Sequence, residues 1–224
     1  MREFKSAATP EVLEYLARHA RQDEVLARVE RETAGMPRAG MQVSVDQGAL
    51  LTLLTKLVGT RRALEIGTFT GYSAVCIARG LADGGRLTCL ELEQDYAATA
   101  RRYLEAAGLA DRVEIVVGPA QETLEALPDE PVYDLVFIDA DKPSTADYVR
   151  WALKLSRPGS VVVVDNVARS GAVIDAASTD ASVQGVRRLM DYLATEPRLD
   201  ATAIQTVGLK GYDGFLIALV REPA

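Results

Sequence analysis

Histidine and cysteine are scarce in this chain of 224 residues. The one histidine, His19, stands in an N-terminal segment with a helical pattern, which disfavours any mechanism that depends on a histidine base, a catalytic triad included. The two cysteines, Cys76 and Cys89, lie in apolar stretches, too few for a disulfide framework and without zinc-site spacing. We expect both to be buried in a protein of a reducing compartment.

The sequence also has no excess of positive over negative charge and no long apolar run. The 25 Lys and Arg residues are outnumbered by 32 Asp and Glu, giving a net charge of −7, so the chain has no surplus of positive charge with which to bind nucleic acid. The longest apolar run, residues 215–220, is too short to span a membrane, and the charged N-terminus has no signal-peptide core. We therefore expect a cytoplasmic protein, with neither a nucleic acid nor a membrane as its partner.

What is present is the composition of a folded domain, with 48% hydrophobic residues and only 9 prolines. The length fits one medium-to-large domain, which we place over residues 1–224. Residues 1–60 have helical patterns, with Pro10 in a first helical position and Ser44 and Gln47 at capping-box spacing. We interpret them as a helical cap on a core formed by residues 61–224.

The core alternates short apolar segments with helical ones, which predicts an α/β fold built from βαβ units. Strands are expected at 62–66, 86–90, 113–117, 133–138 and 160–164, helices at about 72–82, 95–107, 120–127, 144–155 and 182–195, and last strands near 200–206 and 214–220. The glycine-rich stretch 208–214 predicts an antiparallel hairpin at the edge of this seven-stranded, mostly parallel sheet, with helices on both faces.

Ligands of such sheets bind beyond the carboxyl ends of the strands. The first strand runs into Glu65 and a turn with Gly67 and Gly71, where backbone can approach a ligand closely. These glycines do not form the G-x-G-x-x-G dinucleotide fingerprint. Glu91 ends the second strand, where it could accept hydrogen bonds from ribose hydroxyls. The pair indicates a nucleoside-containing ligand, and the alternative is an ordinary turn with a solvated carboxylate.

Three oxygen-bearing side chains follow the fourth and fifth strands: Asp139, Asp165 and Asn166. Such a set suits a hard divalent cation and leaves positions open for water and substrate oxygens. Lys142, three residues past Asp139, could act as a general base beside the cation. The alternative is that the two aspartates are structural, as a cap, an ion pair or a turn, and that Lys142 is a surface lysine.

In their order and spacing, these motifs resemble the class I S-adenosylmethionine-dependent O-methyltransferases, specifically the cation-dependent group containing catechol O-methyltransferase and caffeoyl-CoA O-methyltransferase. The resemblance covers nearly the whole chain and rests on six short motifs: Met41, Glu65-Ile66-Gly67-Thr68-Phe69-Thr70-Gly71-Tyr72-Ser73, Glu91, Gly118-Pro119-Ala120, Ile138-Asp139-Ala140-Asp141-Lys142 and Asp165-Asn166. It implies a Rossmann-like fold with extra N-terminal helices, and commonly a homodimer.

The resemblance also implies roles for single residues. S-adenosylmethionine would be bound by Val43, Glu65, Gly67, Thr68, Ser73, Glu91, Ala120, Asp139 and Asp141. Mg²⁺, or Mn²⁺ or Ca²⁺, would be held by Asp139, Asp165 and Asn166, with Lys142 as the base and Asp139 also in the catalytic set. Lys5 would match a substrate-contacting lysine of the plant branch, whereas Ser170 stands where that branch often has a substrate-binding asparagine.

The implied reaction is methyl transfer to a hydroxyl of a catechol-like or phenylpropanoid small molecule. Two vicinal hydroxyls on the cation would favour the phenolate and aim one oxygen at the methyl group. Three alternatives remain: a metal-independent or N-directed methyltransferase, a nicotinamide oxidoreductase, which the missing fingerprint disfavours, and a non-catalytic cofactor-binding protein.

Overall fold

The computed structural model describes residues 10–20, 22–208 and 211–222. Its helices are α1 (Pro10–Ala17), α2 (Glu24–Thr33), α3 (Val45–Val58), α4 (Tyr72–Gly80), α5 (Gln94–Ala106), α6 (Ala120–Ala126), α7 (Thr145–Leu155) and α8 (Ala181–Thr195). Its strands are β1 (Arg62–Ile66), β2 (Arg86–Glu91), β3 (Val113–Val117), β4 (Tyr133–Ile138), β5 (Ser156–Asp165), β6 (Leu199–Gly208) and β7 (Gly211–Val220). Short 3₁₀ helices are η1 (Ala39–Met41), η2 (Ala110–Arg112), η3 (Lys142–Ser144) and η4 (Arg169–Ile174).

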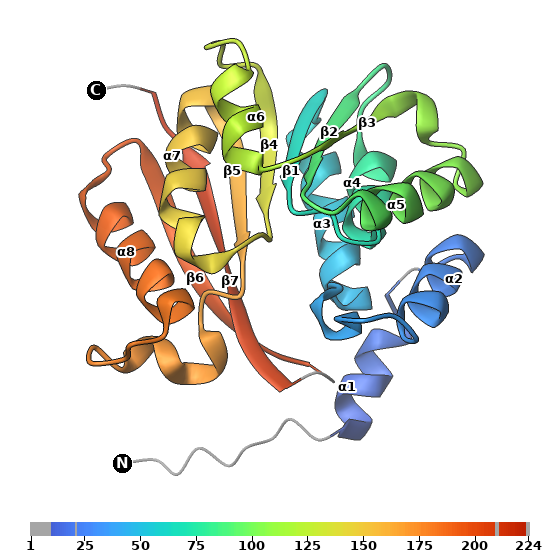
Figure 1. Ribbon diagram of the computed structural model, residues 1–224, viewed down its shortest axis with the longest axis horizontal. Helices are drawn as coiled ribbons and strands as arrows, with labels where there is room; N and C mark the ends of the chain where they lie inside the picture. Colours follow the sequence, from blue (N-terminus) through green and yellow to red (C-terminus); the bar gives the residue numbers. More distant parts are fainter. Residues whose placement is uncertain (1–9, 21, 209–210, 223–224) are drawn as a thin grey trace.

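The strands form one sheet in the order β3-β2-β1-β4-β5-β7-β6, with the first five parallel. This confirms the predicted seven-stranded, mostly parallel fold (Figure 1). The antiparallel strand is β7, which lies one place in from the edge because β6 pairs along its outer side. The strand predicted from residue 160 begins earlier, at Ser156, and its register with β4 shifts before Val161.

Helices cover both faces of the sheet (Figure 1). Alternate residues of the central strands enter two buried clusters, as the two-residue period of a strand requires. Leu64 and Val136 pack with α6, α7 and α8, whereas Ala63 and Phe137 pack with α2, α3, α4 and α5. The carboxyl ends of β1, β2, β4 and β5 are thereby left free to form a site between the helix layers.

The ends of the N-terminal helices follow the predicted signals. Helix α1 begins at Pro10, while its expected capping residue lies outside the described residues. Helix α3 begins after Ser44, whose hydroxyl oxygen accepts a hydrogen bond from the Gln47 N–H (3.4 Å). His19 is exposed just after α1, and both cysteines are free and buried, as predicted. Within the described part of the chain, none of the helices has the length and apolar character needed to cross a bilayer.

Candidate active site

The turn after β1 brings three strand ends together. Gly67 has a φ of 89°, and a Cβ atom there would lie 2.1 Å from the carbonyl oxygen of Asp139, so only glycine fits. Its N–H donates to the Leu90 carbonyl (2.9 Å), while the Asp139 N–H donates to the Ile66 carbonyl (2.9 Å). The ends of β1, β2 and β4 are therefore in direct contact.

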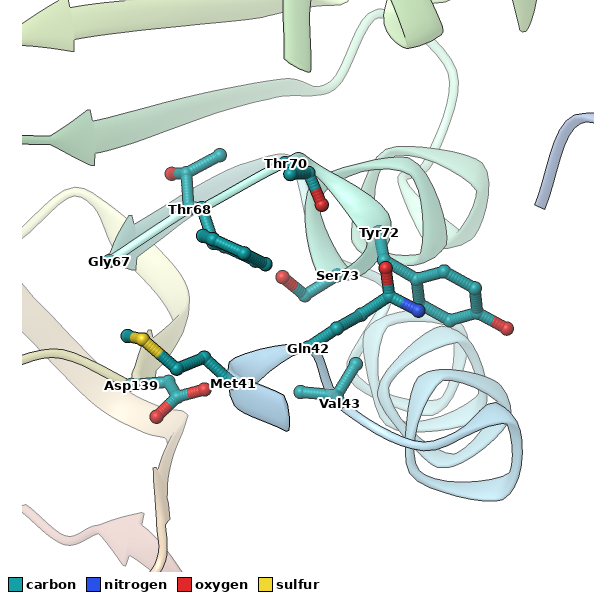
Figure 2. Close-up of a pocket in the computed structure, with 10 residues that line it drawn as sticks. Met41, Gln42, Val43, Gly67, Thr68, Thr70, Tyr72, Ser73 and Asp139 are labelled. Carbon is teal, nitrogen blue, oxygen red and sulfur yellow. The ribbon is translucent and has the colours of Figure 1, made fainter. Parts of the chain in front are cut away.

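A cavity opens beside this turn, and Figure 2 shows the side chains around it. The cavity is lined by Gly67 and by four other predicted cofactor residues: Val43, Thr68, Ser73 and Asp139. The other lining residues are Met41, Gln42, Phe69, Thr70 and Tyr72, to which the sequence assigned no individual role. All of these except Gln42 belong to the motifs on which the resemblance rests. That membership is the feature of the sequence that could have predicted their place in the site.

The N-terminal helices take part in this cavity. Residues 41–43, at the end of η1 and in the segment leading to α3, form part of its lining. Helix α2 contacts the β1 turn through a buried hydrogen bond between the hydroxyls of Thr33 and Thr70 (3.0 Å). The N-terminal segment thus helps to shape the site.

Glu65, at the end of β1, is fully buried, and neither of its carboxylate oxygens has a hydrogen-bond partner among the residues that the structure describes. Burial raises the pKa of Glu65 from 4.5 to about 7, and the neighbouring Ser73, Cys89 and Thr68 side chains oppose this rise only in part. The hydroxyl of Thr68 is also buried and has no hydrogen-bond partner in the described part of the chain. Buried polar groups are normally paired, so these two residues fit a ligand that brings hydrogen-bond donors, such as an α-amino group.

Glu91 at the end of β2 is buried and already accepts three backbone hydrogen bonds. Its Oε2 accepts from the N–H groups of Thr68 (3.1 Å) and Phe69 (2.6 Å), and its Oε1 accepts from that of Glu93 (2.9 Å). A carboxylate offers about four acceptor positions, so room remains for a further donor such as a ribose hydroxyl. Phe69 has a φ of 51° and packs edge-on against Tyr96, so Glu91 also holds a left-handed turn in place.

The other predicted cofactor residues lie at neighbouring strand ends. Ala120 is the first residue of α6, directly after β3, and the Gly118 N–H donates to the Glu91 carbonyl (3.0 Å). Asp141 caps η3, where its carboxylate accepts from the Ser144 N–H (3.1 Å) and the Tyr148 hydroxyl (2.6 Å). Both Asp141 oxygens therefore have partners inside the chain.

Asp139 and Asp165 form the acidic part of the site. Burial and then the charge of Asp139 raise the pKa of Asp165 to about 6, while Lys142, Gln47 and the Asn166 N–H oppose the rise. Ile138 pairs with Val164 in the β4–β5 register, so Asp139 and Asp165 follow paired residues at the ends of adjacent parallel strands. Asp165 Oδ1 accepts from the Asn166 N–H (2.8 Å), and Asn166 itself has a φ of 60°.

These oxygens suit a hard cation by their chemistry. Two carboxylates and one amide offer only oxygen ligands, and a divalent cation would relieve the repulsion between Asp139 and Asp165. Within the described ranges, no three His, Cys, Asp or Glu side chains gather as a metal-binding group. The candidate set has only two such residues, and its third predicted ligand, the Asn166 amide, is not of these types.

Lys142 is nearly buried beside this acidic pair. Its Nζ lies 2.8 Å from Asp139 Oδ1. Helix α8 packs directly on its backbone, because a Cβ atom at Gly185 would lie 2.1 Å from the Lys142 carbonyl oxygen. The structure thus brings together Asp139, Lys142 and Asp165, as predicted, and excludes the alternative of a surface lysine. Lys5 lies outside the described residues, and Ser170 is exposed on the turn after β5.

Comparison with known proteins agrees with this geometry. The model of a family described as O-methyltransferase matches residues 17–220. A catechol O-methyltransferase of Mycobacterium tuberculosis is 50% identical over 190 residues, covering 85% of this chain and 84% of that protein. A catechol O-methyltransferase of Niastella koreensis is 45% identical, covering 84% and 85% of the two chains.

Solved structures are similar as well. The O-methyltransferase of Bacillus cereus, in complex with SAH, has a TM-score of 0.89 at 46% identity and covers 94% of this chain and 97% of its own. TomG of Streptomyces achromogenes, an O-methyltransferase in complex with SAM, has the same TM-score and identity and covers 95% and 96% of the two chains. All of these matches are O-methyltransferases. They therefore do not support the two alternatives of a nicotinamide oxidoreductase and a non-catalytic cofactor-binding protein. The chain belongs to the O-methyltransferase family.

Proposed function

We propose that this protein transfers a methyl group from S-adenosylmethionine to one hydroxyl of a catechol-like or phenylpropanoid small molecule, with a divalent cation and with Lys142 as the base. The observation that carries the proposal is the cluster of Asp139, Lys142 and Asp165 at the ends of two neighbouring strands, directly beside the cavity that contains Asp139. A purely structural role would not require a nearly buried lysine paired with a carboxylate at this edge of the sheet.

The cofactor part of the proposal rests on the β1 and β2 ends. The unpaired Glu65 and Thr68 side chains would receive the α-amino group of the methionine portion, together with Val43, Gly67 and Ser73. The remaining acceptor position of Glu91 would take a ribose hydroxyl, and Ala120 would lie at the adenine. Asp139 and Asp141 would lie near the sulfonium, whose positive charge favours carboxylate neighbours.

The cation part rests on Asp139, Asp165 and Asn166. Mg²⁺, or Mn²⁺ or Ca²⁺, would be held by their oxygens and, when bound, would favour the deprotonated form of a phenol. A free phenol, with a pKa near that of tyrosine at about 10, is mostly protonated at neutral pH. Lys142 would take the proton as a neutral amine, which requires that its ion pair with Asp139 opens and that the ammonium first releases a proton to water when the site is loaded.

Methyl transfer is an in-line displacement, so the oxygen, the methyl carbon and the sulfur must be aligned. In this chain the cofactor turn and the acidic pair are fixed against each other through Gly67 and Asp139. That contact would hold the donor and the acceptor at a constant separation, which supports the assignment of both to one site.

We also propose that the protein is a homodimer. Helices α1 and α3 expose large apolar side chains: Val12 (47% exposed), Leu16 (59%), Leu53 (57%) and Leu57 (82%). Burial of such groups against a second copy would be favourable. Light scattering after size exclusion tests this, and a mass of one chain at micromolar concentration would contradict it.

The proposed activity is tested with the purified protein, S-adenosylmethionine and a panel of aromatic vicinal diols, with Mg²⁺ or with EDTA, following methylated product by mass. We expect product from vicinal diols only, with Mg²⁺ only, and none from matched phenols with a single hydroxyl. Turnover that persists in EDTA and in Asp165→Ala would support the alternative of a metal-independent or N-directed methyltransferase.

A further inference from the structure

The turn that follows β5 has an unfavourable backbone conformation. Asn166, Arg169 and Ser170 have φ values of 60°, 50° and 51°, and Gly171 has a φ of 87°. The left-handed conformation is unfavourable for Arg169 and Ser170, which carry a Cβ atom, so this turn needs outside contacts to keep its shape. It also begins with Asn166, one of the candidate cation ligands.

Strand β7 supplies those contacts, one residue after another. The Val167 N–H donates to the Gly214 carbonyl (2.9 Å). Asp213 Oδ1 accepts from the N–H groups of both Ala168 (2.9 Å) and Arg169 (2.9 Å). The part of β7 that extends beyond the end of β5 thus binds the turn along its length.

Tyr212 adds one more contact on the same side. Its hydroxyl donates to the Ser170 carbonyl (2.7 Å), and a Cβ atom at Gly171 would lie 2.1 Å from the tyrosine oxygen. The turn is therefore packed against β7 as well as hydrogen-bonded to it. Of these contacts, the Asp213 carboxylate accepts hydrogen bonds from two backbone N–H groups. Hydrogen bonds to a charged acceptor are stronger than those to a neutral carbonyl oxygen.

We propose that Asp213 is a positioning residue for Asn166. Asp165 is aligned by the ladder itself, since it pairs with Phe215, but Asn166 lies beyond the last paired residue of β5. The direction of its side chain depends on the backbone of the turn, which Asp213 fixes two and three residues further on. Without this carboxylate the turn would relax, and the direction of the Asn166 side chain relative to Asp165 would no longer be fixed.

The inference rests on the proposed function, in which Asn166 holds the cation, and it adds a residue from the other end of the chain to that site. Groups that orient metal ligands commonly change metal affinity on the order of 10- to 100-fold when they are removed. We expect the loss of Asp213 to weaken binding of the cation and the acceptor. Cofactor binding at the turn with Glu65 and Glu91 should be unchanged.

The test measures Mn²⁺ binding by electron paramagnetic resonance, with no cofactor or acceptor present. We expect Asp213→Ala to weaken Mn²⁺ binding about tenfold or more. Asp213→Asn, which keeps the Oδ1 acceptor, should restore most of the affinity, and Tyr212→Phe should give a smaller loss. Asp200→Ala is the matched control, because this aspartate lies on the same hairpin, is exposed and forms an ion pair with Arg221 on the surface (3.6 Å).

A second measurement separates this inference from the proposed function. In a ¹⁵N-labelled protein without metal, the side-chain amide signals of Asn166 should move in Asp213→Ala and stay in place in Asp200→Ala. If wild type bound no Mn²⁺, the cation proposal would be wrong, and these signals alone would decide the positioning role. Unchanged Asn166 signals in Asp213→Ala, or equal Mn²⁺ affinity in Asp213→Ala and Asp200→Ala, would overturn the positioning role of Asp213.

Discussion

The ammonium of Lys142 lies 2.8 Å from the carboxylate of Asp139, and the lysine side chain is only 10% exposed. This pair is the point at which the proposed base and the proposed cation site meet. In the ligand-free protein each group satisfies the other. A bound cation would bind the Asp139 carboxylate and disfavour the ammonium form of Lys142, and the neutral amine, once its proton had passed to water, could accept the proton of the acceptor hydroxyl.

We predict that Lys142→Met lowers kcat by about 10²- to 10⁴-fold, the usual contribution of a general base, with little change in cofactor affinity. Lys142→Arg distinguishes a base from a structural cation, because arginine keeps the charge and does not give up its proton. The measurement is steady-state turnover with a vicinal diol, together with calorimetry of cofactor binding.

The control for this lysine is Lys154→Met, at a surface ion pair with Asp129 (3.1 Å). It should retain wild-type turnover. A Lys142→Arg variant with nearly normal kcat would show that only the charge matters, and the role of base would have to be abandoned.

The buried Glu65 predicts a pH-dependent stability. Its pKa is raised from 4.5 to about 7 in the folded protein, so the folded chain retains a proton that the unfolded chain loses between these values. Stability from this group is therefore present at low pH and lost as the pH rises toward 7 and above. A pKa difference of this size corresponds to about 3 kcal/mol.

We expect urea unfolding of the ligand-free, metal-free protein to give a lower free energy of unfolding at pH 8 than at pH 5. Glu65→Gln should remove the larger part of that difference, with a smaller part left from Asp165, whose pKa is raised to about 6, whereas Glu105→Gln, at an exposed position of α5, should leave the whole difference in place. Equal pH dependence in the two variants would show that Glu65 is not the responsible group.

The same carboxyl predicts proton release on cofactor binding. A cationic amino group beside Glu65 lowers its pKa, so at pH 7 about half a proton should leave the protein with each cofactor bound. Calorimetry in two buffers with different ionisation enthalpies measures this number. Glu65→Gln should bind more weakly and release no proton, and identical proton release in wild type and variant would rule out this role.

Close packing at the cofactor turn predicts a large difference between two glycines. Gly67 and Gly84 have similar φ values of 89° and 70°, but only Gly67 lies against backbone, since a Cβ atom at Gly84 would meet nothing within 4 Å. Alanine at Gly84 should cost about 1–2 kcal/mol for its conformation alone. Alanine at Gly67 should cost at least about 2 kcal/mol more, because the ends of β1 and β4 must separate. Similar midpoints of denaturation for the two variants would contradict this reading of the turn.

Much of this fold could be predicted from the sequence, because the apolar periodicity changes cleanly between strands and helices. The first four strands begin where expected, each between turn residues and a helical pattern. The fifth was predicted too short, since Pro158 and Gly159 interrupt its apolar pattern while the strand continues through a change of register. Local patterns do not reveal such irregularities, which depend on the neighbouring strand.

The site was partly predictable for a related reason. Residues at the ends of adjacent parallel strands must lie close together, which was enough to bring Asp139, Lys142 and Asp165 into one cluster. The hydrogen bond from the Tyr148 hydroxyl to the Asp141 carboxylate could not be predicted, because it depends on the 3₁₀ turn η3 that lies between these two residues. The contact of Asp213 with Ala168 and Arg169 joins residues more than 40 positions apart, and no local spacing indicates it.

The most direct test of the whole account is the rate of methyl transfer from S-adenosylmethionine to a vicinal diol as a function of Mg²⁺ concentration, in wild type, Asp165→Ala and Asp200→Ala. We predict a rate that rises with Mg²⁺ and saturates in wild type and Asp200→Ala, and that is at least about 100-fold lower in Asp165→Ala. A wild-type rate independent of Mg²⁺ and resistant to EDTA, or full activity in Asp165→Ala, would contradict the cation-dependent mechanism.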